Sequence, residues 1–401
     1  MHEPHLMGWL EANSIKGKIS FSFEYAESWL LTHEQFLLDP DISWFSGRQY
    51  PSYSGNFGIF LDSMPDTWGR TLMKRRVAFQ AQKNSATPSV LNEVDFLLGV
   101  YDQSRMGALR FKLDPDGPFL DNSAAFPTPP WSSVRELQYS AKVLEMDEPD
   151  EDIQPYLQLI MAPGSSLGGA RPKANILDKQ GSLWIAKFPS KNDIIDFALW
   201  EMLVYKLAVK SKIWMAESKV ERVLDAHHTF FTKRFDRHFQ ERIHFSSAMT
   251  MTGHNEKELR ELTASYLELA DFIQFSSASI EVDLAQLWRR IVFNIAVSNT
   301  DDHLRNHGFL LSSKGWRLSP AYDLNPSIDK SGLSLNIDLE RNDLDFELAV
   351  SVGEYFLLNK SQMDSILKEV FSAVKEWKSV AKSLKIPRKE ILLMEQAFRW
   401  K

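Results

Sequence analysis

The chain has 401 residues, 44% hydrophobic and 25% charged, which is typical of a globular protein long enough for two or three packed parts. Its formal net charge of -7 argues against binding nucleic acid through overall charge, and the absence of cysteine excludes disulfides, thiolate nucleophiles and cysteine-based metal sites. The N-terminus lacks the basic start and apolar core of an export signal, and no apolar run approaches the roughly 20 residues that span a bilayer. We therefore expect a cytoplasmic protein without a membrane segment.

The start of the chain predicts a unit of mixed helix and strand. Residues Ile19, Phe21, Phe23 and Tyr25 alternate with smaller or polar neighbours, as in a strand with one buried face. The turn residues in "SGNFGIFLDSMPDTWGRTLMKRR" lead into a helix expected from Trp68. The sequence "MGALRF", at residues 106–111, predicts another short strand.

Two polar stretches follow, and both predict loops. Residues 113–131 are rich in Pro, Asp, Gly and Ser and form the best linker candidate. Six carboxylates lie between Glu145 and Asp152. They could bind a hard cation, but a solvated acidic loop is the favoured interpretation.

The pattern changes again beyond residue 164. A strand is expected in "SLWIAKFPS", an amphipathic helix over residues 194–208 and a strand in "HTFFTKRFDR", and from about residue 246 the pattern is mainly helical. The predicted organisation is therefore an N-terminal α+β subdomain at 1–130, a second part of mixed helix and strand at 131–245 and a mainly helical part at 246–401.

The segment "SNTDDHLRNHGFLL" carries the first chemical signal. Asp301 and Asn306 have the spacing of the catalytic loop of protein kinases, where the aspartate faces the hydroxyl nucleophile and the asparagine holds a metal ion. A second metal-binding carboxylate should follow a strand, and "GWRLSPAYDLNPS" supplies Asp323. The intervening "GFLL" and the turn residues predict a hairpin that brings Asp301 and Asp323 together at the entrance of one site.

Upstream residues could bind the phosphates of a nucleotide. The glycines of "GSSLGGARPKA" lower the steric cost of close approach and present backbone amides. Lys187, in the apolar setting "WIAKFP", requires a carboxylate or phosphate partner if it is buried, and Glu201 on the following helix is the natural carboxylate. Each feature alone could be ordinary structure, but loop, lysine, helix glutamate, Asp-x4-Asn and metal aspartate occur in the order of a kinase.

Together, "GSSLGGARPKA", "IAKFP", "KRFDR", "SNTDDHLRNHGFLL" and "LSPAYDLNPS" resemble the HipA-type serine/threonine kinases, the toxins of bacterial toxin-antitoxin systems. The segments "FGIFLDSMPDTWGRTLM" and "MGALRF" are similar to the N-terminal subdomain of that family, so the resemblance covers nearly the whole chain. It implies an α+β, two-lobed, protein-kinase-like fold with an added N-terminal α+β subdomain and a mainly helical C-terminal lobe.

The resemblance also implies roles for single residues. Asp301 corresponds to the catalytic aspartate, Asn306 and Asp323 to the magnesium ligands, and Lys187 and Glu201 to the phosphate lysine and its helix glutamate. The residues expected at the ATP site are Gly164, Ser165, Ser166, Leu167, Gly168, Gly169, Ala170, Lys187, Glu201 and Phe235. The implied cofactors are ATP and Mg²⁺.

Ser166 falls where family members carry an autophosphorylated serine. A phosphate there adds nearly two negative charges to a loop that receives the phosphates of ATP, so it would switch the kinase off. Ser165 is the neighbouring alternative, and both serines could instead serve turn geometry.

Two positions depart from the family pattern. Lys233 stands where many relatives have an acidic residue before "RFDR", which leaves the side chains near adenine undetermined. Arg305 replaces the family lysine before the motif asparagine, so charge is kept while geometry changes.

The resemblance implies a protein substrate such as an aminoacyl-tRNA synthetase, and a helix-turn-helix antitoxin through which DNA is bound indirectly. Two alternatives remain open. The chain could be a small-molecule phosphotransferase on the same fold, or a catalytically silent co-repressor subunit. A zinc site at His303 and His307 is disfavoured, because no glutamate lies between them.

Overall fold

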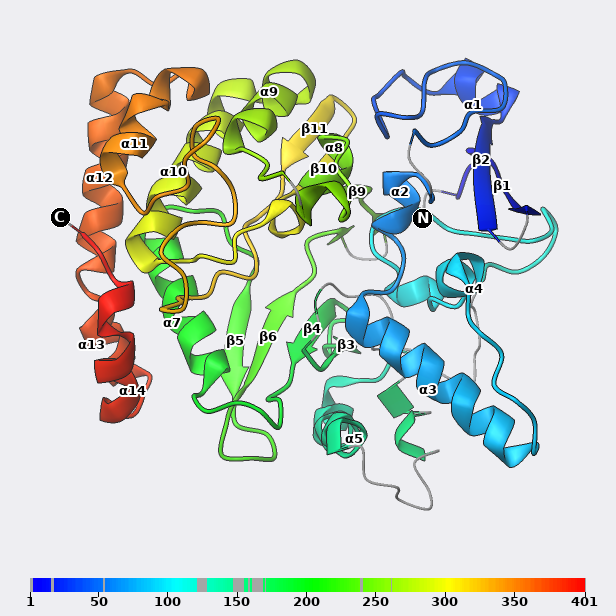
Figure 1. Ribbon diagram of the computed structural model, residues 1–401, viewed down its shortest axis with the longest axis horizontal. Helices are drawn as coiled ribbons and strands as arrows, with labels where there is room; N and C mark the ends of the chain where they lie inside the picture. The colour runs from blue at the N-terminus through cyan, green and yellow to red at the C-terminus, as the bar shows by residue number, and fades with distance from the viewer. Residues whose placement is uncertain are drawn as a thin grey trace. The chain divides into compact units, whose positions relative to one another are not determined.

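The computed structural model describes residues 3–15, 18–52, 55–120, 128–146, 155–157, 159–160, 169, 171–238, 241–260 and 262–400 (Figure 1). The chain divides into two compact units. Unit 1 comprises Met1–Lys191 and Asp236–Ser246, and unit 2 comprises Asn192–Phe235 and Ser247–Lys401. The sequence predicts three parts rather than two, and the boundaries of these three parts stay a prediction.

Unit 1 begins with an antiparallel hairpin of β1 (Gly8–Ile15) and β2 (Lys18–Tyr25), in which Gly8 pairs with Tyr25. Phe21, Phe23 and Tyr25 are each only 2% exposed, and the rings of Phe23 and Tyr25 meet edge to face. The alternating pattern therefore predicted this strand and its buried face correctly.

The long helix of unit 1 is α3 (Thr67–Lys83), which starts one residue before the predicted position. Asp66 is its N-cap, and one carboxylate oxygen accepts a hydrogen bond from the backbone amide of Gly69 at 2.7 Å. The other helices of unit 1 are α1 (Glu27–Thr32), α2 (Gly58–Leu61), α4 (Glu93–Leu98), α5 (Val134–Met146) and the 3-10 turns η1 (Asp102–Ser104) and η2 (Trp131–Ser133).

The strand predicted at residues 106–111 is wrong. Gly107 has φ +73°, which interrupts an extended chain, and its backbone amide donates to the carboxylate of Asp236 at 2.8 Å. Phe111 forms one isolated bridge with Leu120. Bonds from the backbone to a side chain distant in sequence thus replace the ladder that the apolar pattern predicted.

Unit 1 also contains the hairpin of β3 (Lys173–Leu177) and β4 (Leu183–Lys187), paired so that Lys173 faces Lys187. The strand β4 confirms the prediction made for "SLWIAKFPS". Three short strands complete the regular structure of this region: β7 (Arg237–His238), β8 (Glu241–Arg242) and β9 (Phe245–Ser247), the last of which crosses the boundary between the units.

A buried carboxylate makes the stability of unit 1 depend on pH. Asp39 is 2% exposed and accepts backbone hydrogen bonds from Asp41 and Ile59 at 2.9 and 2.8 Å. Burial raises its pKa to about 6, with the nearby charges of Asp41 and Asp62 adding to the effect. Because the folded pKa exceeds the unfolded one, the folded state binds this proton more tightly, and stability is lost as pH rises from about 4 to about 6.

We expect the free energy of unfolding of the wild type to fall, relative to that of Asp39→Asn, by about 2 kcal/mol between pH 4 and pH 7. Urea unfolding of both proteins at the two pH values measures this difference. A gap between the two proteins that is the same at both pH values would contradict the assignment.

Unit 2 opens with α7 (Phe197–Lys210), which confirms the predicted amphipathic helix, and the hairpin of β5 (Ser218–Glu221) and β6 (Thr229–Lys233). Ala198 and Met202 of α7 pack with Phe230 of β6 in a buried cluster. The helix also contacts α12 and α13. One face of α7 thus covers a hairpin, and the helix contributes to the core.

The rest of unit 2 is mainly helical, as predicted, around α10 (Ile280–Val297), which contacts both α9 (Tyr266–Ser276) and α12 (Lys360–Val374) (Figure 1). A hairpin of β10 (Gly308–Ser312) and β11 (Gly315–Leu318) follows α10, which confirms the predicted hairpin. The other helices of unit 2 are α8 (Ala248–Met251), α11 (Phe346–Ser351), α13 (Trp377–Ser383), α14 (Arg388–Leu393) and the 3-10 turns η3 (Glu258–Arg260), η4 (Leu304–Asn306), η5 (Gly353–Phe356) and η6 (Met394–Ala397). Within the described ranges, no helix has both the length and the apolar character needed to cross a bilayer.

Candidate active site

The loop that carries the predicted catalytic aspartate begins where α10 ends. Ser298, the C-cap of α10, has φ 51° and ψ 48°, a left-handed conformation that turns the chain out of the helix. Asp301 follows with a side chain that is 75% exposed, and its carboxylate lies 3.7 Å from the ammonium of Lys330. The loop therefore presents Asp301 to solvent, where a substrate hydroxyl could reach it.

The next residue, Asp302, points the other way and is 0% exposed. Its Oδ2 accepts hydrogen bonds from Asn294 Nδ2 at 2.7 Å and from the hydroxyl of Tyr266, and it lies 2.8 Å from His307 Nε2. Burial alone would raise the pKa of Asp302, but His307 and the hydrogen bond from Tyr266 outweigh it, so the pKa lies below its usual range. Asp302 is thus a buried anchor, and only Asp301 of the pair is accessible.

The hairpin joins the Asp301 loop to the segment before Asp323. The backbone amide of Ser319 donates to the carbonyl of Gly308 at 2.9 Å, and the hydroxyl of Tyr322 donates to the carbonyl of Arg305 at 2.8 Å. Asn306, which is 8% exposed, donates through Nδ2 to the carbonyl of Asp301 at 2.9 Å. The structure therefore brings the two predicted motifs together on either side of one hairpin.

Asp323 adopts a conformation that is rare for residues other than glycine. Its φ is +58°, a left-handed conformation that costs roughly 1–2 kcal/mol for an L-residue, although aspartate tolerates it better than most. The carboxylate oxygen Oδ1 accepts a hydrogen bond from Asn325 Nδ2 at 3.3 Å. Local strain of this kind persists where the surroundings impose a position, and it is found most often at functional sites.

Phe235, predicted near the nucleotide, lies beside the same segment. Its ring centroid is 5.6 Å from that of Tyr322, the residue before Asp323, with an angle of 34° between the planes.

Lys233 lies 3.8 Å from Glu217, and Arg305 pairs with Glu256 at 2.9 Å. The two positions that depart from the family pattern therefore form exposed ion pairs.

Lys187 and Glu201 lie in different units. Lys187 is the last residue of β4 and is half-buried, whereas Glu201 is on α7 and is 8% exposed. Their ion pair stays a prediction.

Most of the Gly-rich loop, comprising Gly164, Ser165, Ser166, Leu167, Gly168 and Ala170, lies outside the described residues. Gly169 is described and has φ +93°, a value that favours glycine. Its carbonyl accepts a hydrogen bond from the backbone amide of Trp68 at 3.4 Å. The indole of Trp68 donates to the carbonyl of Lys173 at 3.1 Å, and the ammonium of Lys173 lies 3.2 Å from Asp66. The N-terminal end of α3 therefore holds the point where the loop enters β3.

The contacts that Lys173, Asp66 and Trp68 make at this point were not predicted from the sequence. Their only signals are the lysine in "GGARPKA" and the cap residue in "MPDTWG", and nothing in either segment points to the other. The side chains of Lys173 and Asp66 are 5% and 6% exposed, so this ion pair lies inside the protein.

Replacing Lys173 with methionine should destabilise the fold by about 3 to 5 kcal/mol, because it removes a positive charge from beside a buried carboxylate. Urea unfolding measures the loss. The matched control is Lys210→Met, which breaks the exposed pair with Glu376 and should cost less than about 1 kcal/mol. Equal losses in the two variants would contradict the importance of the buried pair.

The predicted metal ligands are oxygen donors, which suit Mg²⁺. Among the described side chains, no three His, Asp or Glu residues gather into a ready-made metal site. Asn306 and Asp323 would therefore need phosphate oxygens as further ligands, which is how Mg²⁺ is usually held beside a nucleotide. The residues present fit that mode of binding.

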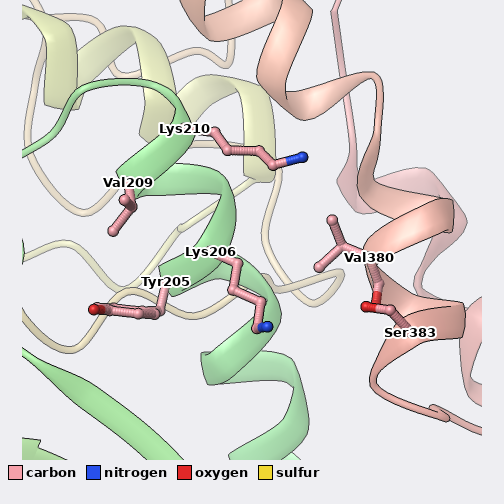
Figure 2. Close-up of a pocket in the computed structure, with 6 residues that line it drawn as sticks. All are labelled: Tyr205, Lys206, Val209, Lys210, Val380 and Ser383. Atoms are coloured by element: carbon pink, nitrogen blue, oxygen red, sulfur yellow. The ribbon is translucent and has the colours of Figure 1, made fainter.

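A pocket of about 330 Å³ opens on unit 2 between α7 and α13 (Figure 2). Its lining residues are Tyr205, Lys206, Val209, Lys210, Val380 and Ser383. Lys210 pairs with Glu376, and the lining contains none of the predicted catalytic or nucleotide-binding residues. The pocket is therefore formed by residues other than those predicted to act in phosphoryl transfer.

Comparison with known proteins relates the chain to one family. Residues 165–378 match the family described as the HipA-like C-terminal domain. A chain of the HipA–HipB toxin-antitoxin complex of Shewanella oneidensis MR-1, solved with its operator DNA, is similar with a TM-score of 0.66 and 15% identity, over 98% of this chain and 94% of that one. The Helicobacter pylori proinflammatory kinase CtkA matches with a TM-score of 0.43 and 15% identity, over 58% of this chain and 88% of that one. A search of curated proteins gives no match. The predicted α+β, kinase-like fold is confirmed, with the HipA structure as the similar fold.

Proposed function

The chain belongs to the HipA-like family, and from that premise we propose that it is an ATP- and Mg²⁺-dependent serine/threonine protein kinase. One observation carries the proposal: an exposed aspartate, a buried asparagine and a strained second aspartate are held on either side of one hairpin in unit 2. These are the residue types, in the order, that phosphoryl transfer requires.

In this proposal Asp301 orients the substrate hydroxyl and accepts its proton as the oxygen attacks the terminal phosphate of ATP. Its high exposure supports the role, because a protein substrate must reach it from solvent. Asn306 and Asp323 hold Mg²⁺ through their oxygens, and the bound ion supplies charge neutralisation for the phosphates. The hydrogen bond from Asn306 to the carbonyl of Asp301 ties the metal ligand to the catalytic residue.

The Gly-rich loop, from Gly164 to Ala170, binds the phosphates through backbone amides in this proposal. Lys187 adds a positive charge beside the phosphates, and Glu201 pairs with Lys187. Phe235 packs against the adenine base of ATP. Autophosphorylation of Ser166, with Ser165 as the alternative, would place a second set of phosphate charges in the loop and stop the reaction.

We infer the substrate and the partner from the family. The substrate is proposed to be a protein of the translation apparatus, such as an aminoacyl-tRNA synthetase. The similar Shewanella oneidensis protein was solved with HipB and operator DNA. A helix-turn-helix antitoxin is accordingly the proposed partner here, with DNA bound indirectly through it, in the cytoplasm.

Incubation of the wild type and of Asp301→Ala with labelled ATP and Mg²⁺, followed by mass spectrometry of the intact chain and its phosphopeptides, tests the proposal. Phosphate on Ser166 or Ser165 in the wild type alone would support a serine kinase and its off-switch. Nucleotide binding without phosphate incorporation would favour a small-molecule phosphotransferase or a co-repressor subunit. Failure to bind nucleotide would overturn the proposal.

A further inference from the structure

We propose that Asn294, a buried residue of α10, is a positioning residue that fixes the Asp323 segment relative to the Asp301 loop. The inference rests on the proposed function for its catalytic meaning. Asn294 does not contact the proposed reacting atoms in this structure and would act through two short chains of hydrogen bonds.

Both ends of the Asn294 amide are used inside the protein, where the residue is 0% exposed. Nδ2 donates to Asp302 Oδ2 at 2.7 Å, and Oδ1 accepts from Asn299 Nδ2 at 3.1 Å. The carboxylate of Asp302 can only accept, so the NH₂ group must face it and the oxygen must face Asn299. The orientation of this amide is therefore determined by its neighbours.

On one side, the chain of hydrogen bonds reaches the catalytic loop. Asp302 is bonded directly to Asp301 in sequence, and its buried carboxylate is held by Asn294, His307 and Tyr266. Because side chains from three parts of the fold hold Asp302 in place, the buried side of the loop determines how the polypeptide presents Asp301 to solvent.

On the other side, the chain reaches the proposed metal ligand. Asn299, which is 1% exposed, accepts through Oδ1 a hydrogen bond from the backbone amide of Asn325 at 3.4 Å. Asn325 in turn donates through Nδ2 to Asp323 Oδ1 at 3.3 Å. A parallel backbone bond links Ser327 to the carbonyl of Ser298 at 3.0 Å. Asn294 thus stands between Asp302 and the segment that contains Asp323.

The strained backbone of Asp323 explains why this series of hydrogen bonds matters. A left-handed aspartate relaxes unless its surroundings hold it, and a buried donor left without an acceptor destabilises the arrangement around it. Removing the Asn294 amide would leave Asn299 Nδ2 without its acceptor, so Asn299 would be free to release Asn325. The expected consequence is a looser Asp323 segment and a weaker hold on Mg²⁺.

The test compares Asn294→Leu with Gln286→Leu. Gln286 lies on the same helix, is 8% exposed, and also uses both ends of its amide, donating to the carbonyl of Lys212 at 3.0 Å and accepting from the amide of Trp214 at 3.2 Å. Both changes remove a buried amide of α10. Asn294 bonds to the side chains of Asp302 and Asn299, whereas Gln286 approaches the Asp323 segment only through the backbone of Trp214, whose carbonyl accepts from the amide of Ala321 at 2.7 Å. Gln286→Leu should leave activity unchanged.

Hydrogen–deuterium exchange is measured without nucleotide or metal, so its result does not depend on activity. In Asn294→Leu, the peptide containing Asn325 and Ser327 should exchange roughly tenfold faster than in the wild type, and in Gln286→Leu it should not. In phosphorylation assays, Asn294→Leu should raise the Mg²⁺ concentration for half-maximal rate. Equal exchange of this peptide in the two variants would overturn the proposal.

Should Asn294→Leu fail to fold, Asn299→Ala breaks the same chain without touching Asp302, and the same peptide should exchange faster. Unchanged exchange in Asn299→Ala would equally overturn the inference. Absence of phosphorylation in the wild type would instead overturn the proposed function. Asn294 would then have no role in catalysis, but the exchange result would still decide whether it positions the Asp323 segment.

Discussion

Replacing Asp301 with asparagine is expected to lower kcat by roughly 10²- to 10⁴-fold, the range that a positioned proton acceptor contributes. Asparagine keeps the size of the side chain but cannot take the proton of the attacking hydroxyl. Because the side chain is 75% exposed, the free energy of unfolding and the affinity for ATP with Mg²⁺ should stay close to those of the wild type. Initial rates of phosphate incorporation at saturating ATP measure the effect.

The matched control is Asp329→Asn, which removes one negative charge from another exposed residue of unit 2. Its kcat should remain within about twofold of the wild type, because only long-range charge changes and salt screens it. A wild-type rate in Asp301→Asn would remove Asp301 from the catalytic role. A comparable loss in both variants would indicate a general effect of charge.

Replacing Asp323 with asparagine is expected to lower kcat by roughly 10²- to 10³-fold, the size of effect seen when one preorganised charge-stabilising group is removed from an active site. Asparagine also tolerates a left-handed backbone, so the φ of +58° can be kept and the loss assigned to the carboxylate. Alanine would confound the loss of the metal ligand with backbone strain.

The two variants should differ in their dependence on Mg²⁺. Asp323→Asn should require a higher Mg²⁺ concentration and bind ATP with Mg²⁺ less tightly, whereas Asp301→Asn should change neither. Titration of Mg²⁺ at fixed ATP, with binding measured by calorimetry, separates them. If Asp323→Asn had the same requirement for Mg²⁺ as the wild type, Asp323 would not be a metal ligand.

Local patterns predicted several elements correctly. The alternation around Phe23 marked β2, the run after Gly308 marked the β10–β11 hairpin, and the turn residues before Trp68 marked α3. Such elements depend on interactions between residues close in sequence, or on which face is buried, and both leave a period in the sequence. The strand predicted at residues 106–111 was wrong because the amide of Gly107 bonds to Asp236, more than a hundred residues away.

For the candidate site, sequence alone determined which residue types occur and in what order: the aspartate and asparagine of the loop, the second aspartate and the hairpin between them. Only the tertiary structure decided that Asp301 faces solvent while Asp302 is buried, because the partners of Asp302 come from α9, α10 and β10 or their ends. The roles of Asn294 and of the Lys173–Asp66 pair were likewise decided by the fold. Buried polar side chains are satisfied by whichever partners the fold places beside them, and these lie far apart in sequence, so no local pattern predicts them.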